Sequence, residues 1–179
     1  MILLAVIGRA LYAGTLTAGF IYDDAVAIVD NASIRRPGDL ADILAAPRNT
    51  PTAGRPVVNL TLAVNHALGG MDVRGYHAFN IAVHVCCALL LYGIVRRTLT
   101  GREGTTIAFA VALLWMVHPL QSECVAYVTQ RTESVMAFFF LLTLYCAIRR
   151  WCAAAIVSCA LGMASKESMV TAPLMVVLI

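Results

Sequence analysis

The sequence has little charge. Only 13% of its 179 residues are Asp, Glu, Lys or Arg, whereas 60% are hydrophobic. A soluble domain is normally about a quarter charged and about half apolar. A core of this size has no room for the surplus apolar surface. We therefore predict an integral membrane protein, for which the lipid bilayer is the solvent.

Several chemical signatures are also missing from the sequence. Lys and Arg do not form runs interleaved with aromatics, so nucleic acid is not an expected partner. The six cysteines show no CxxC spacing, so neither a zinc site nor a disulfide framework is predicted. No glycine-rich phosphate loop, HExxH pattern or GxSxG elbow occurs. These absences exclude the commonest nucleotide-binding and hydrolase motifs.

Apolar runs predict an all-α protein, a polytopic transmembrane helical bundle with about six spans. The predicted spans are residues 1–21, 76–95, 105–117, 134–148, 151–164 and 169–179. Several are shorter than the ~20 residues that cross a bilayer, so polar flanks must complete them. Residues 22–75 form a long first loop with short helices expected at 40–46 and 57–68. The last run reaches Ile179 without a polar exit flank, which suggests an N-terminal fragment of a longer protein.

Two arginine-rich loops set the expected orientation. They cover residues 96–102 and 149–150, two spans apart, and the positive-inside rule makes their side cytoplasmic. The opposite face then receives the first loop, the predicted loop 118–133, and Lys166-Glu167. The polar clusters that look most functional thus share the extracytoplasmic or luminal face, and this shared face predicts a site there.

The adjacent carboxylates Asp23 and Asp24 end the first apolar run. Such a pair is most often a solvated helix end, but at a membrane surface it also suits a functional role. In the loop 118–133, Arg131 has a guanidinium fork that matches phosphate oxygens. The alternative for that loop is a solvated segment with an ion pair.

The remaining polar candidates each have an ordinary structural explanation. Lys166 and Glu167 suit either a cap with a snorkelling lysine or a cation beside a lipid phosphate. Asn80 and His84 share one helix face and favour hydrogen bonding between helices. His77 stands at the outer mouth and is a candidate for facing a site. Two triplets, which begin at residues 31 and 59, fit the glycosylation sequon.

Several motifs, in this order, resemble a known family. The segment 20–24 resembles the first-loop acidic motif of lipid-linked glycosyltransferases of the GT-C type. Further pieces look like the transmembrane and tetratricopeptide-repeat containing O-mannosyltransferases. They are Arg55-Pro56-Val57-Val58-Asn59-Leu60-Thr61, Tyr76-His77-Ala78-Phe79-Asn80 with His84, His118-Pro119-Leu120-Gln121-Ser122-Glu123, Arg131-Thr132-Glu133 and Ser165-Lys166-Glu167. The resemblance covers nearly the whole chain, which would be the N-terminal part (1–179) of the transmembrane domain. The family's C-terminal repeats are absent from it.

The resemblance implies a membrane glycosyltransferase with an outward-facing site. Its donor would be a polyprenyl-phosphate sugar, typically mannose, and its acceptor a hydroxyl, often of protein Ser or Thr. Asp23 or Asp24 would be the base, and Asp23 is favoured because it matches the first acidic residue of the related motif. Arg131 and Lys166 would bind the phosphate. The substrate-binding residues would be completed by Glu167, His118, Glu123 and His77.

No cofactor or metal is expected, although adjacent carboxylates can also hold a divalent ion. The partners implied by the resemblance would be the bilayer, the lipid-linked sugar and a protein acceptor, in a bacterial inner membrane or the endoplasmic reticulum. Two alternatives stay open. One is a transporter or channel subunit, and the other is a non-catalytic membrane anchor for a repeat scaffold. Charges gather at one mouth rather than deep in the spans, which favours an enzyme over a transporter.

Overall fold

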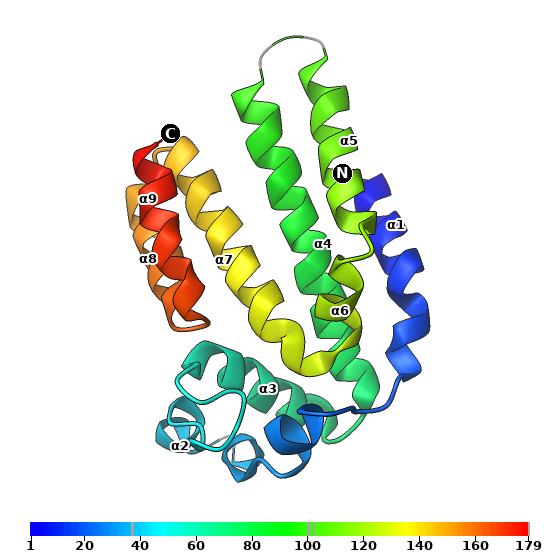
Figure 1. Ribbon diagram of the computed structural model, residues 1–179, viewed down its shortest axis with the longest axis vertical. Coiled ribbons are helices and arrows are strands. Elements are labelled where there is room, and N and C mark those ends of the chain that lie inside the picture. The colour runs from blue at the N-terminus through cyan, green and yellow to red at the C-terminus, as the bar shows by residue number, and fades with distance from the viewer. Residues whose placement is uncertain (37, 100, 102, 179) are drawn as a thin grey trace.

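The computed structural model describes residues 1–36, 38–99, 101 and 103–178, and this part of the chain is helical without a strand (Figure 1). The predicted all-α class is therefore confirmed. The α-helices are α1 (Ile2–Tyr12), α2 (Leu40–Leu44), α3 (Pro56–Gly69), α4 (Val73–Thr98), α5 (Gly104–Val117), α6 (Gln121–Ala126), α7 (Arg131–Ile148), α8 (Cys152–Met163) and α9 (Thr171–Val177). Single turns are η1 (Ala13–Thr17), η2 (Ala25–Val29), η3 (Ala32–Arg35), η4 (Val128–Gln130) and η5 (Glu167–Val170).

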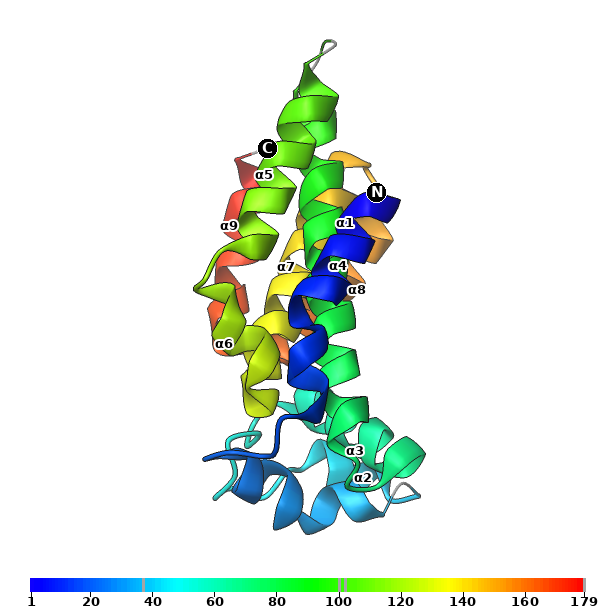
Figure 2. The ribbon, with the colours of Figure 1, turned by 90° about the vertical axis from the view of Figure 1, so that its right-hand side faces the viewer.

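The helices form a bundle that is closed at one end by the first loop. The long helix α4 packs against α1, α5 and α7, and α7 packs in turn against α8 and α9. Helices α2 and α3 lie across the lower end of the bundle (Figures 1 and 2). The predicted helices at 40–46 and 57–68 correspond to α2 and α3.

Local sequence explains where α4 begins and how closely it packs. The side chain of Asp72 accepts a hydrogen bond from the Arg74 amide at 3.0 Å and so caps the helix. Arg96 and Arg97 occupy its last turn, where cations favour the helix dipole. A Cβ at Gly93 would lie 2.8 Å from the Tyr145 ring, so glycine lets α4 and α7 approach closely.

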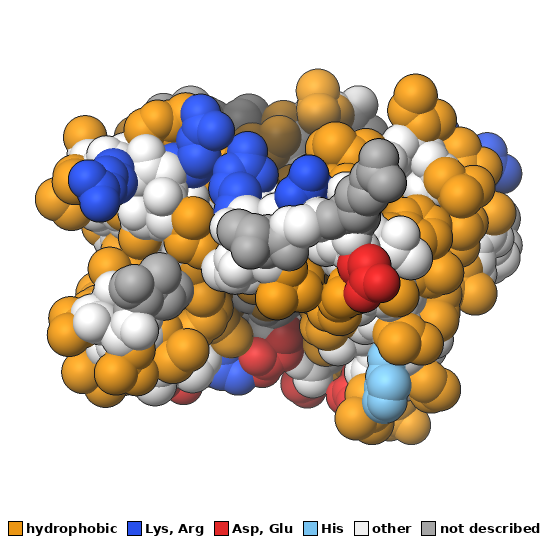
Figure 3. All heavy atoms as spheres, turned by 90° about the horizontal axis from the view of Figure 1, so that it is seen from above, with side chains coloured by type: hydrophobic (Ala, Val, Ile, Leu, Met, Phe, Trp, Pro, Cys, Tyr) orange, Lys and Arg blue, Asp and Glu red, His pale blue; other side chains and the backbone are white. Residues whose placement is uncertain are grey.

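The opposite end of the bundle carries exposed arginines. Arg96, Arg97, Arg149 and Arg150 are all exposed there, at the ends of α4 and α7. Figure 3 looks down on this end and shows arginine side chains, in the colour shared by Lys and Arg, gathered on it. Arg102, which the sequence also places in this group, lies outside the described residues. The two ends of the molecule are thus chemically different.

Two described helices are long and apolar enough to cross a membrane. They are α4 and the segment Val128–Ile148, and only 39% of each apolar window is buried inside the protein. The core helix of a soluble protein is mostly buried, so these outward-facing apolar surfaces are consistent with lipid contact. The other apolar helices are shorter, which leaves the number of six spans a prediction.

Two predicted boundaries differ from the structure. The first apolar run is not helical to Ile21, since η1 ends at Thr17 and an extended link follows. The loop expected between His118 and Glu133 instead contains α6 and η4, and α7 begins at Arg131. The first turn of α7 is polar in sequence but packs against α3 and α4, and this tertiary packing overrides the polarity pattern.

Candidate functional site

The two adjacent aspartates have opposite environments. Asp24 is 1% exposed, whereas the side chain of Asp23 is exposed. Tyr22 precedes them with a φ of 44°, in the left-handed region that is uncommon for a residue with a bulky side chain. This sharp bend comes just before the acidic pair, whose two carboxyl groups lie in different environments, one buried and one exposed.

Asp24 fastens the first loop to the start of α7. Its carboxylate accepts hydrogen bonds from the Thr129 amide at 2.8 Å, the Thr129 hydroxyl at 2.5 Å and the Ile21 amide at 3.1 Å. Hydrogen bonds to an ionised acceptor are about twice as strong as neutral ones. Both carboxylate oxygens are engaged, so the burial of this charge is compensated and its position is fixed.

Asp23 is held through its backbone. Its amide donates to the Tyr127 hydroxyl at 2.9 Å, and the Tyr127 ring meets the Tyr22 ring edge to face at 6.4 Å between centroids. Burial, and then the charges of Asp23 and Asp24, raise the pKa of the Tyr127 phenol despite its hydrogen bond to the Asp23 amide. Tyr127 therefore remains protonated at neutral pH, and the Asp23 carboxylate is the solvent-exposed one of the pair.

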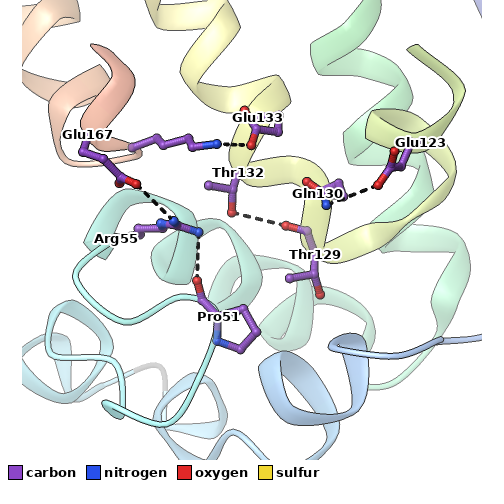
Figure 4. Close-up of polar contacts among 9 residues, drawn as sticks. Pro51, Arg55, Glu123, Thr129, Gln130, Thr132, Glu133 and Glu167 are labelled. Atoms are coloured by element: carbon purple, nitrogen blue, oxygen red, sulfur yellow. Dashed lines mark hydrogen bonds and ion pairs between the residues drawn. The ribbon is translucent and has the colours of Figure 1, made fainter. Parts of the chain in front are cut away.

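A second polar group joins α3, α7 and η5 at the same end of the bundle. Lys166 forms an ion pair with Glu133, and Arg55 forms one with Glu167 at 3.7 Å (Figure 4). Arg55 also donates to the Pro51 carbonyl at 3.0 Å. The Lys166 and Arg55 side chains are 22% and 26% exposed, so both cations are partly shielded yet reachable from solvent. This arrangement suits an anionic ligand that exchanges with the carboxylates.

Arg131, predicted to bind phosphate, lies in the protein core instead. It is 0% exposed and donates to Asn80 Oδ1 at 3.1 Å, Asn65 Oδ1 at 2.7 Å, Thr61 Oγ1 at 3.3 Å and the Tyr76 carbonyl at 3.1 Å. Its guanidinium also stacks over a phenylalanine ring at 4.4 Å. In this conformation it joins α3, α4 and α7 and has no open face for a phosphate.

Of the other predicted site residues, two are exposed and one is buried. Glu123 is exposed on α6, 3.5 Å from the Gln130 amide nitrogen (Figure 4). His118 is exposed, and its Nδ1 accepts the Leu120 amide at 3.3 Å, ahead of α6. His77 is 0% exposed and its Nε2 lies 3.0 Å from the Ala18 carbonyl, so it contacts the extended link, while its buried Nδ1 has no hydrogen-bond partner among the described residues.

The polar pair inside α4 has the structural role expected from its spacing. His84 Nε2 lies 3.0 Å from the Met116 carbonyl of α5. Asn80 holds Arg131 of α7. Both side chains are thus bonded to neighbouring helices, and hydrogen bonding between helices is confirmed. Hydrogen bonds between helices thus account for both polar side chains of this pair inside α4.

Three residues at this end escaped the sequence reasoning as site residues. Thr129 and Tyr127 lie in a segment without a distinctive motif, and their role depends on contacts with residues 105 and 104 positions away. Arg55 stands within a quoted motif, but no spacing rule connects it with Glu167. Among the described residues, no group of three or more His, Cys, Asp or Glu side chains is arranged to hold a metal ion.

Fold and site together define a class of protein. It is a bundle of apolar helices, consistent with membrane insertion, that carries a polar site with an accessible carboxylate and two reachable cations at one end. No family model and no solved structure matches the chain.

Curated relatives identify the family that the chain resembles. The chain is 34% identical to protein O-mannosyl-transferase Tmtc1 of Drosophila melanogaster, over 78% of this chain and 17% of that protein. It is 31% identical to protein O-mannosyl-transferase TMTC2 of Homo sapiens, over 80% of this chain and 18% of that protein. It is also 30% identical to protein O-mannosyl-transferase F38B6.6 of Caenorhabditis elegans, over 74% of this chain and 20% of that protein. The resemblance to the TMTC family of O-mannosyl-transferases is therefore confirmed, although the chain spans only about a fifth of the relatives' length.

Proposed function

We propose that this chain is the N-terminal part of a membrane glycosyltransferase that moves mannose from a polyprenyl phosphate to a hydroxyl group of protein Ser or Thr. The similarity to curated O-mannosyl-transferases supports the reaction class. The site faces the outside of a bacterial inner membrane or the lumen of the endoplasmic reticulum, because the exposed arginines occupy the other end of the bundle.

Asp23 is the base in this proposal. The carrying observation is its exposed carboxylate, next to an Asp24 carboxylate whose oxygens are both engaged. A general base must come within hydrogen-bond reach of the proton that it removes. Asp24 is a positioning residue that acts through the loop. A divalent ion bridging the pair is disfavoured, since it would have to displace the three hydrogen bonds of Asp24.

The transfer is a single displacement with inversion. The acceptor hydroxyl oxygen forms a bond to the anomeric carbon while its proton passes to Asp23. The bond from that carbon to the phosphate oxygen breaks, and the electron pair leaves with the polyprenyl phosphate. Lys166, and Arg55 in preference to the enclosed Arg131, stabilise the growing negative charge on the phosphate.

The test follows labelled mannose from polyprenyl-phosphate mannose to protein, in membranes that contain the complete gene product. Asp23→Asn is compared with Asp30→Asn, which changes an exposed acid of the same loop. We expect Asp23→Asn to lower transfer by about 10²-fold or more, as for loss of a general base, at equal expression. Transfer equal in the two variants would refute the assignment of the base. No transfer from wild type with any of several lipid-linked sugars would refute the activity.

A further inference from the structure

A cavity outside the residues of the proposed reaction is lined by Tyr22, which precedes Asp23, and by Tyr127, whose hydroxyl accepts a hydrogen bond from the Asp23 amide. It has a volume of about 540 Å³, within the range of small-ligand sites. It opens between the extended link after η1 and helix α6. Its lining residues are Ala18, Gly19, Ile21, Tyr22, Ser122, Glu123, Ala126 and Tyr127. The walls are thus largely apolar, with two phenols, one hydroxyl and one carboxylate among them.

Tyr22 is the most unusual residue of this cavity. Its ring is 85% exposed, although its backbone has the left-handed φ of 44°. Such a conformation costs on the order of 1 kcal/mol or more in a non-glycine residue and persists only where neighbours impose it. Here the hydrogen bonds of Asp24 on both sides of the bend impose it. A large aromatic ring is thereby held at the mouth of the cavity, over Tyr127.

The cavity and the two cations lie on different sides of the start of α7. Glu123 lines the cavity, whereas Glu133 and Glu167 pair with the cations, and Figure 4 shows Glu123 across η4 from both of them. In a single displacement, the incoming hydroxyl and the leaving phosphate occupy opposite sides of the anomeric carbon. If the cations hold the phosphate, the acceptor approaches from the side of Asp23 and the cavity.

We propose that this cavity is the acceptor subsite, and that it takes a hydroxyl-bearing segment of polypeptide. Tyr22 and Tyr127 form the apolar walls on which the segment packs, as amphipathic aromatics do at binding surfaces. The Glu123 carboxylate and the Ser122 hydroxyl meet its backbone amides. The inference rests on the proposed function, because it places the acceptor relative to the base Asp23.

The experiment measures steady-state mannose transfer by the complete gene product to a synthetic Ser/Thr peptide, with the donor and the peptide varied separately. Tyr22→Ala is compared with Tyr22→Phe, which keeps the ring, and with Leu120→Ala. Leu120 is 77% exposed just before α6 and does not line the cavity. We expect Tyr22→Ala to raise the KM for the peptide about tenfold, equivalent to about 1.4 kcal/mol. The KM for the donor and the rate of donor hydrolysis by water should change less than about twofold.

The possible outcomes distinguish the acceptor subsite from the proposed mannosyl transfer on which it rests. Near-normal kinetics in Tyr22→Phe and Leu120→Ala, with the peptide KM raised only in Tyr22→Ala, support the acceptor subsite. A raised donor KM with an unchanged peptide KM in Tyr22→Ala overturns it and makes the cavity a sugar site. Unchanged kinetics in Tyr22→Ala overturn it as well. In both cases Asp23→Asn still abolishes transfer, whereas failure of the proposed function shows as transfer that is insensitive to Asp23→Asn.

Discussion

Replacing Arg131 with methionine tests whether this residue is a structural centre or a phosphate ligand. The change keeps an unbranched apolar stem but removes the guanidinium, which donates to Asn80, Asn65, Thr61 and the Tyr76 carbonyl. At about 1 kcal/mol net for each hydrogen bond, the four together are worth about 4 kcal/mol. The lost contact with the aromatic ring adds about 1 kcal/mol. We therefore expect Arg131→Met to be strongly destabilising.

The assay combines thermal unfolding of the purified gene product in nanodiscs with the KM for the lipid-linked donor. Arg131→Lys keeps the charge but not the planar fork, so it should lie between wild type and Arg131→Met in stability. The control is Arg74→Met, because Arg74 is exposed and its replacement should change stability by less than about 0.5 kcal/mol. The reasoning is refuted if Arg131→Met unfolds like Arg74→Met while its donor KM rises tenfold or more, since the guanidinium would then contact the phosphate.

The remaining predictions concern buried asparagines in the first loop and the Cys124 thiol on α6. Asn59 is 0% exposed and bonds to Asn31, Ser33 and the Ile43 carbonyl, so Asn59→Ala should lower the free energy of unfolding by about 3 kcal/mol. Because both sequon asparagines are buried, glycosidase treatment should not change the electrophoretic mobility of the wild type. Burial, and then the charges of two nearby glutamates, raise the pKa of the Cys124 thiol, so maleimide labelling at this cysteine should be slower at pH 7 than labelling of a free thiol and should quicken as the pH rises. The labelling prediction would be contradicted if Cys124, after subtraction of the labelling seen in Cys124→Ser, reacted at pH 7 as fast as a free thiol.

The sequence predicts well whatever depends on local pattern. The apolar runs locate the helices to within a few residues, and the spacing of Asn80 and His84 correctly indicates bonds between helices. The three polar clusters of the predicted outer face do meet at one end, as the contacts of Asp24 with Thr129 and of Arg55 with Glu167 show. These features follow from periodicity and from the alternation of spans, which a linear reading captures.

The sequence does not predict which polar side chains are buried. The sequence predicts Arg131 and not Arg55 as a phosphate ligand, yet of the two only Arg55 keeps a partly exposed side chain, because Arg131 is surrounded by acceptors on two other helices. The sequons at residues 31 and 59 look accessible in a polar loop, but the two asparagines bond to each other in its interior. Such outcomes depend on partners that are distant in the chain, and local pattern carries no signal for them.

The acidic pair illustrates why this distinction matters for function. Two adjacent identical residues have the same local propensities, so nothing near them in sequence decides which one is buried. The decision comes from Thr129, 105 residues away, whose amide and hydroxyl capture Asp24 and draw it into the protein. The left-handed bend at Tyr22 then leaves Asp23 outside and sets the ring over the cavity. A single long-range contact thus divides one motif into a buried, hydrogen-bonded carboxylate and an exposed one, and the exposed carboxylate is the one proposed as the base.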